Sequence, residues 1–159
     1  MRQGARAKDY EESIRWLENA GLVYKVQRIN KPGIPLSSYV DNKSFKLFLL
    51  DTGLLCAMTG ISKDIILKQN TLFTEFKGAL TEQFVCQQLY SACNLKAYYW
   101  SASNSSGEID FLVQDNQNIY AIEVKAAENL KAKSLRAFKE KNSDCKCLRF
   151  SLADYREQD

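Results

Sequence analysis

Hydrophobic and polar positions in the first sixty residues follow two different periods. Apolar residues recur at helical spacing over residues 10–20, and Gly21 follows where a C-terminal cap would lie. Two β-rich runs come next, at residues 23–29 and 44–50, and the polar loop between them begins with Asn30-Lys31-Pro32-Gly33. This pattern predicts a short amphipathic helix and a long-looped hairpin, either as the second half of a winged helix or as a plain hairpin packed on a helix.

A connector is expected after this hairpin. Asp51 has the position of an N-cap for a helix over residues 52–59, which Gly60 would end, and a further short helix is predicted at residues 63–68. We therefore expect two parts: a small winged-helix-like α+β segment with its connector at residues 1–62, and a second domain at residues 63–159.

The second part alternates helical and strand periods in one clear order. The expected elements are a helix at 72–93, strands at 96–101, 108–114 and 119–125, a helix at 130–141 and a strand at 146–152. This α-β-β-β-α-β order predicts an α/β fold.

The hairpin formed by the second and third of these strands has a turn-forming centre, Asp115-Asn116-Gln117-Asn118. If the hairpin is symmetric about Asn116 and Gln117, Asp110 faces Glu123 and Glu108 pairs with Lys125. Alternation then places these four residues on one face of the sheet. Their apolar neighbours would form the opposite face: Ile109, Phe111, Val113, Tyr120, Ile122 and Val124.

Two carboxylates opposite each other, with Cβ atoms about 5 Å apart, repel unless a positive charge lies between them. A divalent cation meets that need, since Mg²⁺ takes one or two carboxylates together with waters and phosphate oxygens. Lys125 could then position or help deprotonate the attacking water, or neutralise charge on the phosphorus. The alternative is a solvated charged face. Two similar motifs, Glu75-Phe76-Lys77 and Asp41-Asn42-Lys43, have no partner carboxylate.

Glu82 is a further candidate on the long predicted helix. It shares a stripe with Ala79, Val85, Cys86 and Leu89, so it points in the direction of the apolar residues. It could supply another metal ligand or hold a water, or it could cap a backbone group or pair with a lysine across the sheet.

Composition narrows the chemistry. The chain of 159 residues is 45% hydrophobic and 26% charged, with net charge +3, which permits contact with nucleic acid without demanding it. The absence of histidine excludes Ser/His and Cys/His hydrolases and His-metal nucleases. No run is apolar enough to be an anchor, and the five cysteines fit reduced thiols, so we expect a cytoplasmic protein without a membrane partner.

Three motifs in the second part resemble the PD-(D/E)XK, or restriction-endonuclease-like, nuclease superfamily: Lys77-Gly78-Ala79-Leu80-Thr81-Glu82-Gln83-Phe84-Val85, Gly107-Glu108-Ile109-Asp110-Phe111 and Ile122-Glu123-Val124-Lys125. Within it they look most like the uncharacterised C-terminal domain of bacterial and archaeal AAA-type ATPases. In the first part, Trp16-Leu17-Glu18-Asn19-Ala20-Gly21-Leu22 and Leu50-Asp51-Thr52-Gly53-Leu54 are similar to the winged-helix-like segment that precedes that domain.

The resemblance implies a mixed sheet and a set of site residues. Asp110, Glu123, the Val124 carbonyl and Glu82 would hold Mg²⁺ or Mn²⁺, and Lys125 would be the catalytic lysine. The chain has no G-x-x-x-x-G-K-[ST] phosphate loop, so an ATPase domain would belong to the same longer protein or to a partner chain.

Three functions follow as expectations. The first is Mg²⁺-dependent hydrolysis of DNA, and the second is a catalytically silent nuclease fold that binds DNA, a partner protein or the ATPase. The third is an oligomerisation tail. Phosphate contacts would come from basic residues of the last helix and of the hairpin loop: Lys131, Lys133, Arg136, Lys139, Lys141, Lys31 and Lys43.

Overall fold

A computed structural model of the chain describes residues 10–61, 64, 74–102, 107–126 and 133–151. In order, its elements are α1 (Glu11–Asn19), β1 (Val23–Ile29), the 3₁₀ helix η2 (Leu36–Tyr39), β2 (Val40–Leu49), α2 (Thr52–Thr59), α4 (Thr74–Ser91), β3 (Ala97–Ser101), β4 (Glu108–Asp115), β5 (Asn118–Val124), α5 (Lys133–Lys141) and β6 (Lys146–Phe150).

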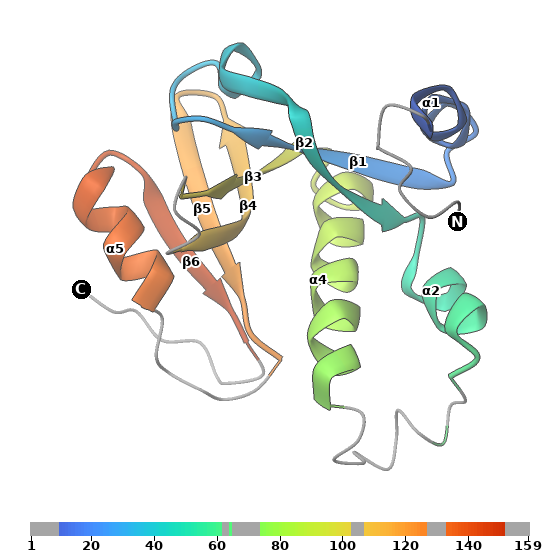
Figure 1. Cartoon of the computed structure of the whole chain (residues 1–159). Helices are drawn as coiled ribbons and strands as arrows, with labels where there is room; N and C mark the ends of the chain where they lie inside the picture. The colour runs from blue at the N-terminus through green and yellow to red at the C-terminus, as the bar shows by residue number, and fades with distance from the viewer. Residues whose placement is uncertain (1–9, 62–63, 65–73, 103–106, 127–132, 152–159) are drawn as a thin grey trace.

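The described strands form one mixed sheet in the order β2-β1-β3-β4-β5-β6, so the fold class is α/β (Figure 1). Neighbouring strands are antiparallel except for two parallel pairs, β1 with β3 and β5 with β6. The expected α-β-β-β-α-β order of the second part is confirmed. The predicted helix at 63–68 and the first residues of the predicted helices at 72–93 and 130–141 lie outside the described residues.

The helix ends follow local chemistry. The Asp51 carboxylate accepts a hydrogen bond from the Leu54 N–H at 2.7 Å, which satisfies one of the donors that the first turn of α2 leaves unpaired. Gly60 ends the same helix with φ 70°, a conformation that is strained for residues with a Cβ atom. Both caps were predicted from the sequence, and both are confirmed.

The first hairpin differs from the expected wing of a separate module. Residues 27–29 of β1 pair in parallel with residues 98–100 of β3, so β1 and β2 extend the sheet of the second part. The second strand is also longer than the predicted 44–50, because β2 begins at Val40, directly after η2. Strand pairing over this distance in sequence has no local signature, so the sequence pattern did not predict it.

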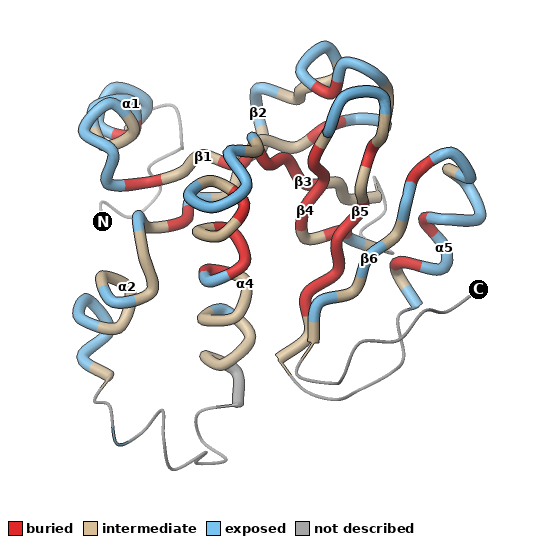
Figure 2. The backbone as a smooth tube through the Cα atoms, turned by 180° about the vertical axis from the view of Figure 1, so that it is seen from behind, coloured by how far each residue is buried: buried red, intermediate tan, exposed pale blue. Residues whose placement is uncertain are grey.

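Two clusters of apolar side chains cover the two faces of the sheet. In Figure 2 buried positions, in red, are prominent along the strands of the sheet and on α4. Val85, Cys86 and Leu89 of α4 pack on one face, against Phe111 and Ile122 among others. Leu135 and Phe138 of α5 pack on the other face in the second cluster. None of the helices in the described part is long and apolar enough to cross a membrane.

Between the turn and Phe111–Ile122, the hairpin of β4 and β5 has the predicted register, whereas the predicted pairs Asp110–Glu123 and Glu108–Lys125 are not part of the ladder. Its ladder runs from Phe111–Ile122 to Asp115–Asn118, so the loop is the two residues Asn116 and Gln117. Asn116 adopts φ 51°, which asparagine tolerates better than most residues. The symmetric turn is therefore confirmed.

A β-bulge interrupts β4 on its other side. Tyr98 of β3 pairs with Leu112 and Trp100 pairs with Ile109, so Tyr99 alone lies opposite both Asp110 and Phe111. The extra residue shifts the alternation, and Ile109 packs with the α5 cluster instead of sharing a face with Phe111. The prediction of unbroken alternation along β4 is therefore wrong at this point.

Candidate functional site

Asp110 lies in the bulge, where β4 and β5 stop forming main-chain pairs. Its Oδ2 accepts a hydrogen bond from the Val124 N–H at 2.7 Å. The side chain of Asp110 thus takes the place of a main-chain acceptor, and it brings the carboxylate to the main chain of Val124, one of the predicted metal ligands. The bulge is the local reason for this arrangement, because it frees the strand from its ladder.

Burial makes the Asp110 carboxylate harder to ionise. Desolvation is the main cause, and it raises the pKa of Asp110 above its ordinary value. The hydrogen bond from Val124 and the charges of Lys46 and Lys125 act in the opposite direction, while the charge of Glu108 adds to the rise. An additional positive charge beside Asp110 would therefore stabilise the ionised form of its carboxylate.

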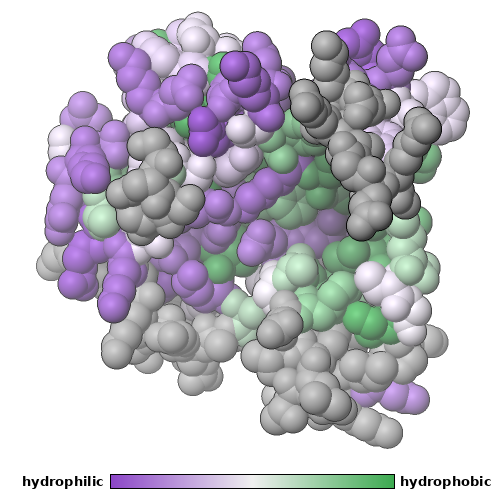
Figure 3. All heavy atoms as spheres, in the orientation of Figure 1, coloured by the Kyte–Doolittle hydropathy of each residue, from purple (hydrophilic) through white to green (hydrophobic). Residues whose placement is uncertain are grey.

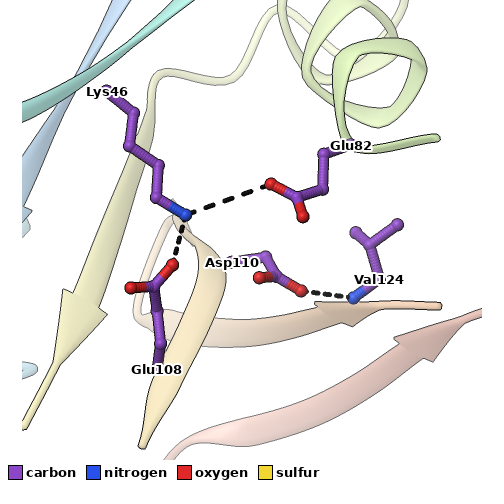
Figure 4. Close-up of polar contacts among 5 residues, drawn as sticks. All are labelled: Lys46, Glu82, Glu108, Asp110 and Val124. Atoms are coloured by element: carbon purple, nitrogen blue, oxygen red, sulfur yellow. Dashed lines mark hydrogen bonds and ion pairs between the residues drawn. The ribbon is translucent and has the colours of Figure 1, made fainter. Parts of the chain in front are cut away.

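Glu82 reaches the same place from α4 (Figure 4). Its pKa is raised first by burial and then by the negative charge of Asp110, while Lys46 lowers it. The Glu82 Oε2 lies 4.0 Å from the Lys46 Nζ. The sequence left open whether Glu82 would be a ligand or a partner of a lysine across the sheet, and the structure places it near both Asp110 and such a lysine.

Lys46 of β2 was not among the predicted site residues. Its Nζ donates a hydrogen bond to Glu108, and it also lies 5.2 Å from the centre of the Tyr99 ring. Desolvation alone would lower the pKa of Lys46, but the bond to Glu108 and the charges of Glu108, Glu82 and Asp110 together raise it. No local motif marks Lys46, because its partner Glu108 is 62 residues away in the sequence.

We use the name charged cluster for Lys46, Glu82, Glu108 and Asp110. The expected pairing of Glu108 with Lys125 is wrong, since Glu108 pairs with Lys46 and Lys125 pairs with Glu123. The bulge explains the difference, because Glu108 lies beyond it and no longer follows the register of the hairpin.

Glu123 and Lys125 form a second part of the site at the end of β5. The Lys125 Nζ lies 2.9 Å from Glu123 Oε1, and the glutamate is only 3% exposed. Its other oxygen, Oε2, is buried and has no hydrogen-bond partner among the described residues. The charge of Lys125 lowers the pKa of both Asp110 and Glu82, so this lysine acts electrostatically on the charged cluster.

The carboxylates of the candidate site provide some of the ligands that a small divalent cation needs. Within the described ranges, no three His, Cys, Asp or Glu side chains are grouped so that they could hold a metal ion together, so Asp110, Glu123 and Glu82 do not form one three-carboxylate set. Mg²⁺ needs only one or two carboxylates with waters and phosphate oxygens. Asp110 with Glu82 would provide them, and the buried Glu123 Oε2 is an acceptor for which the described part of the chain offers no hydrogen-bond donor.

Two of the other predicted features have structural roles. Asp41, in the motif Asp41-Asn42-Lys43, accepts from Arg28 at 2.7 Å and from the Lys43 N–H at 2.9 Å, so its carboxylate stabilises the hairpin. Lys139, a candidate for phosphate contact, donates to the carbonyls of Ser143 and Cys145, both at 2.8 Å. It thus holds the turn after α5. Lys131 lies outside the described residues.

Hydrophilic residues extend to the centre of the molecular face that Figure 3 shows. In Figure 3 hydrophilic residues cover the left and upper parts of the face and continue into its centre, while hydrophobic residues gather to the right of the centre. The charged cluster draws on β2, β4 and α4, which this view shows from the same side as Figure 1.

Comparison with known sequence families divides the chain in two. Residues 1–65 match a family described as a domain of unknown function, DUF8612, and residues 77–158 match a second such family, DUF4143. Domains of the second family often occur at the C-terminus of AAA-type ATPases. No curated protein and no solved structure matches the chain. Since the second match covers just over half of the chain and contains Glu82, Asp110, Glu123 and Lys125, the chain belongs to the DUF4143 family.

Proposed function

We propose that this chain is the C-terminal, restriction-endonuclease-like part of an AAA-type ATPase and that it hydrolyses phosphodiester bonds of DNA with Mg²⁺ or Mn²⁺. The observation that carries the proposal is the meeting of Asp110, Glu82 and the main chain of Val124 at the bulge of β4, under the charge of Lys125. The proposal includes a cytoplasmic location, where thiols stay reduced.

The fold is consistent with this activity. The α-β-β-β-α-β order of the second part and its mixed strand pairing agree with the architecture that the motifs imply. Asp110 comes from the second strand of this series, whereas Glu123 and Lys125 come from the third strand and its end. These positions are the ones that the resemblance assigns to the nuclease motif.

Each residue has a distinct part in the proposed reaction. Asp110 and Glu82 would hold the cation, whose chemistry is to polarise a phosphoryl oxygen and to lower the pKa of a bound water. Lys125 supplies positive charge toward the phosphate and the attacking water. Glu123 holds Lys125 through the 2.9 Å ion pair, which limits the orientations available to the ammonium group.

Cleavage assays with single variants test this proposal. The chain is mixed with Mg²⁺ or Mn²⁺ and with single-stranded, double-stranded and branched DNA. Asp110→Asn and Lys125→Met should each reduce cleavage by about 100-fold or more, because each removes charge that acts on the transition state. Asp115→Asn is the matched control, since Asp115 lies on the same strand but at the hairpin turn, where its carboxylate accepts a hydrogen bond from Asn116, and this variant should cleave DNA as the unaltered chain does.

The proposal would be abandoned if the unaltered chain cleaves none of these DNA forms and calorimetry detects no binding of Mn²⁺. Equal activity of Asp110→Asn and the unaltered chain would likewise exclude this site.

A catalytically silent binding module is the second candidate, and one observation favours it: Lys46 already provides a positive charge to Glu82 and Glu108. In that case DNA affinity should fall steeply with salt, require no divalent cation and be unchanged in Asp110→Asn. The ATPase, or a second copy of the chain, would be the other partner to test, by co-purification and light scattering.

A further inference from the structure

The N-terminal part of the chain contributes a charge to the candidate site. Lys46 belongs to β2, within residues 1–65, whereas Glu82, Glu108 and Asp110 belong to the segment 77–158 that carries the nuclease-like motifs. The Lys46 ammonium contacts Glu108, lies 4.0 Å from Glu82, and acts on Asp110 through its charge (Figure 4). The Lys46 ammonium of the N-terminal part thus lies near three carboxylates of the segment 77–158.

The position of Lys46 is well defined. Its side chain is 27% exposed, and its Nζ lies over the Tyr99 ring at 5.2 Å, which provides a favourable cation–π contact. A half-buried ammonium that is held by a ring and by carboxylates has a fixed place, unlike a lysine on an open surface. Such a lysine can therefore exclude another cation from the same carboxylates.

We propose that Lys46 is the resident counter-ion of the candidate site and that a divalent cation binds there by displacing it from Glu82. This inference rests on the proposed function, because it assumes that Glu82 and Asp110 hold the cation. Lys46 is a positioning residue in this scheme: without a divalent cation it holds the carboxylates, and after displacement it stays over Tyr99 at the edge of the site.

Electrostatics gives the direction of the effect. A fixed positive charge 4.0 Å from the Glu82 carboxylate opposes the binding of a divalent cation there by an amount worth at least about tenfold in affinity, even when the effective dielectric constant is about 20. Removal of the charge at position 46 should therefore tighten divalent-cation binding, although it removes an ion pair from the protein.

Calorimetric titration of the whole chain with Mn²⁺ tests the inference. Lys46→Met should bind Mn²⁺ about tenfold more tightly or better, and Lys46→Gln should behave in the same way. Lys46→Arg, which keeps the charge, should stay close to the unaltered chain. Lys146→Met is the matched control, because Lys146 also lies over a tyrosine ring, that of Tyr120 at 5.4 Å, but on the distant strand β6.

Thermal unfolding gives a second readout that does not depend on cleavage. Mn²⁺ should raise the unfolding midpoint of Lys46→Met by more than it raises that of the unaltered chain, since tighter binding to the folded state stabilises it more. The same two measurements on Lys46→Gln keep the test valid if Lys46→Met folds poorly.

The two proposals fail in different ways. If the unaltered chain binds Mn²⁺ and both uncharged variants bind it equally well or more weakly, the proposed role of Lys46 is wrong. The proposed metal site is not affected by that result. If neither the unaltered chain nor the variants bind Mn²⁺, the metal-dependent function itself is wrong.

Discussion

At the residue scale, the charge on Glu82 is in an unfavourable environment when no divalent cation is bound. Burial and the nearby Asp110 raise its pKa, and Glu108 adds to this, whereas Lys46 and Lys125 only partly compensate. The folded chain therefore holds the proton on Glu82 more strongly than the unfolded chain does. Stability from this group is present below its ordinary pKa of 4.5 and is lost as the pH rises through the folded value.

The variant Glu82→Gln should consequently increase stability at neutral pH. In metal-free buffer with a chelator, its urea midpoint should exceed that of the unaltered chain at pH 7, and the difference should shrink at pH 4, where Glu82 is largely neutral. Glu11→Gln is the control, because Glu11 is exposed and pairs only loosely with Arg15 at 3.7 Å. A loss of stability at pH 7 in Glu82→Gln would show that the ion pair with Lys46 outweighs burial.

At the element scale, the side chain of Gln83 bonds α4 to the main chain at the end of β2. Gln83 is 3% exposed, its Nε2 donates to the Leu49 carbonyl at 2.7 Å, and its Oε1 accepts from the Leu49 N–H at 2.9 Å. Gln83 therefore satisfies both main-chain groups of Leu49. Gln83 is the residue next to Glu82 on α4, and Leu49 lies three residues after Lys46 on β2. The contact between Gln83 and Leu49 therefore also fixes how Glu82 and Lys46 approach each other.

Gln83→Leu should reduce the free energy of unfolding by about 1 to 3 kcal/mol, because it removes the side-chain partners of the part-buried N–H and carbonyl of Leu49. Gln87→Leu is the matched control on the same helix. The Gln87 side chain accepts one hydrogen bond among the described residues, from the Thr52 N–H at 3.2 Å, so its loss should cost less. Urea denaturation measures both, and equal losses would refute the special role assigned to Gln83.

At the scale of the whole molecule, the two segments matched by different families share both layers of the core. Val26 and Phe48 of the N-terminal part pack with Phe111 and Val85, and the second layer likewise includes Ile29 and Leu36. The edge of β3 is also covered by β1. Neither the core nor the sheet is complete in the second segment alone.

A fragment of residues 74–159 should therefore fold poorly. It would expose the apolar faces of the sheet and an unpaired strand edge, which favour aggregation. We expect the whole chain to unfold in a single cooperative transition, monitored by circular dichroism, and the fragment to show none. A fragment that unfolds as cooperatively as the whole chain would show instead that the second segment is an independent domain.

Much of the architecture followed from patterns that are local in the sequence. Apolar periodicity predicted the order of helices and strands, Asp51 and Gly60 predicted the ends of α2, and the turn around Asn116 predicted the register of β4 with β5. Each of these features depends on residues that are close together in the chain. The same local motifs identified Asp110, Glu123 and Lys125, and helical spacing pointed to Glu82.

Only the tertiary structure determined which hydrogen bonds and ion pairs these residues form. The bulge at Asp110 depends on pairing with β3, and it turned the expected Glu108–Lys125 pair into separate pairs with Lys46 and Glu123. Lys46 reaches Glu108 across 62 residues, and Gln83 reaches Leu49 across 34. Contacts over such separations leave no periodic trace, because they depend on how β2, α4 and the sheet pack together. Local sequence patterns thus pointed to Asp110, Glu123, Lys125 and Glu82, whereas packing added Lys46 and decided which side chains pair with one another.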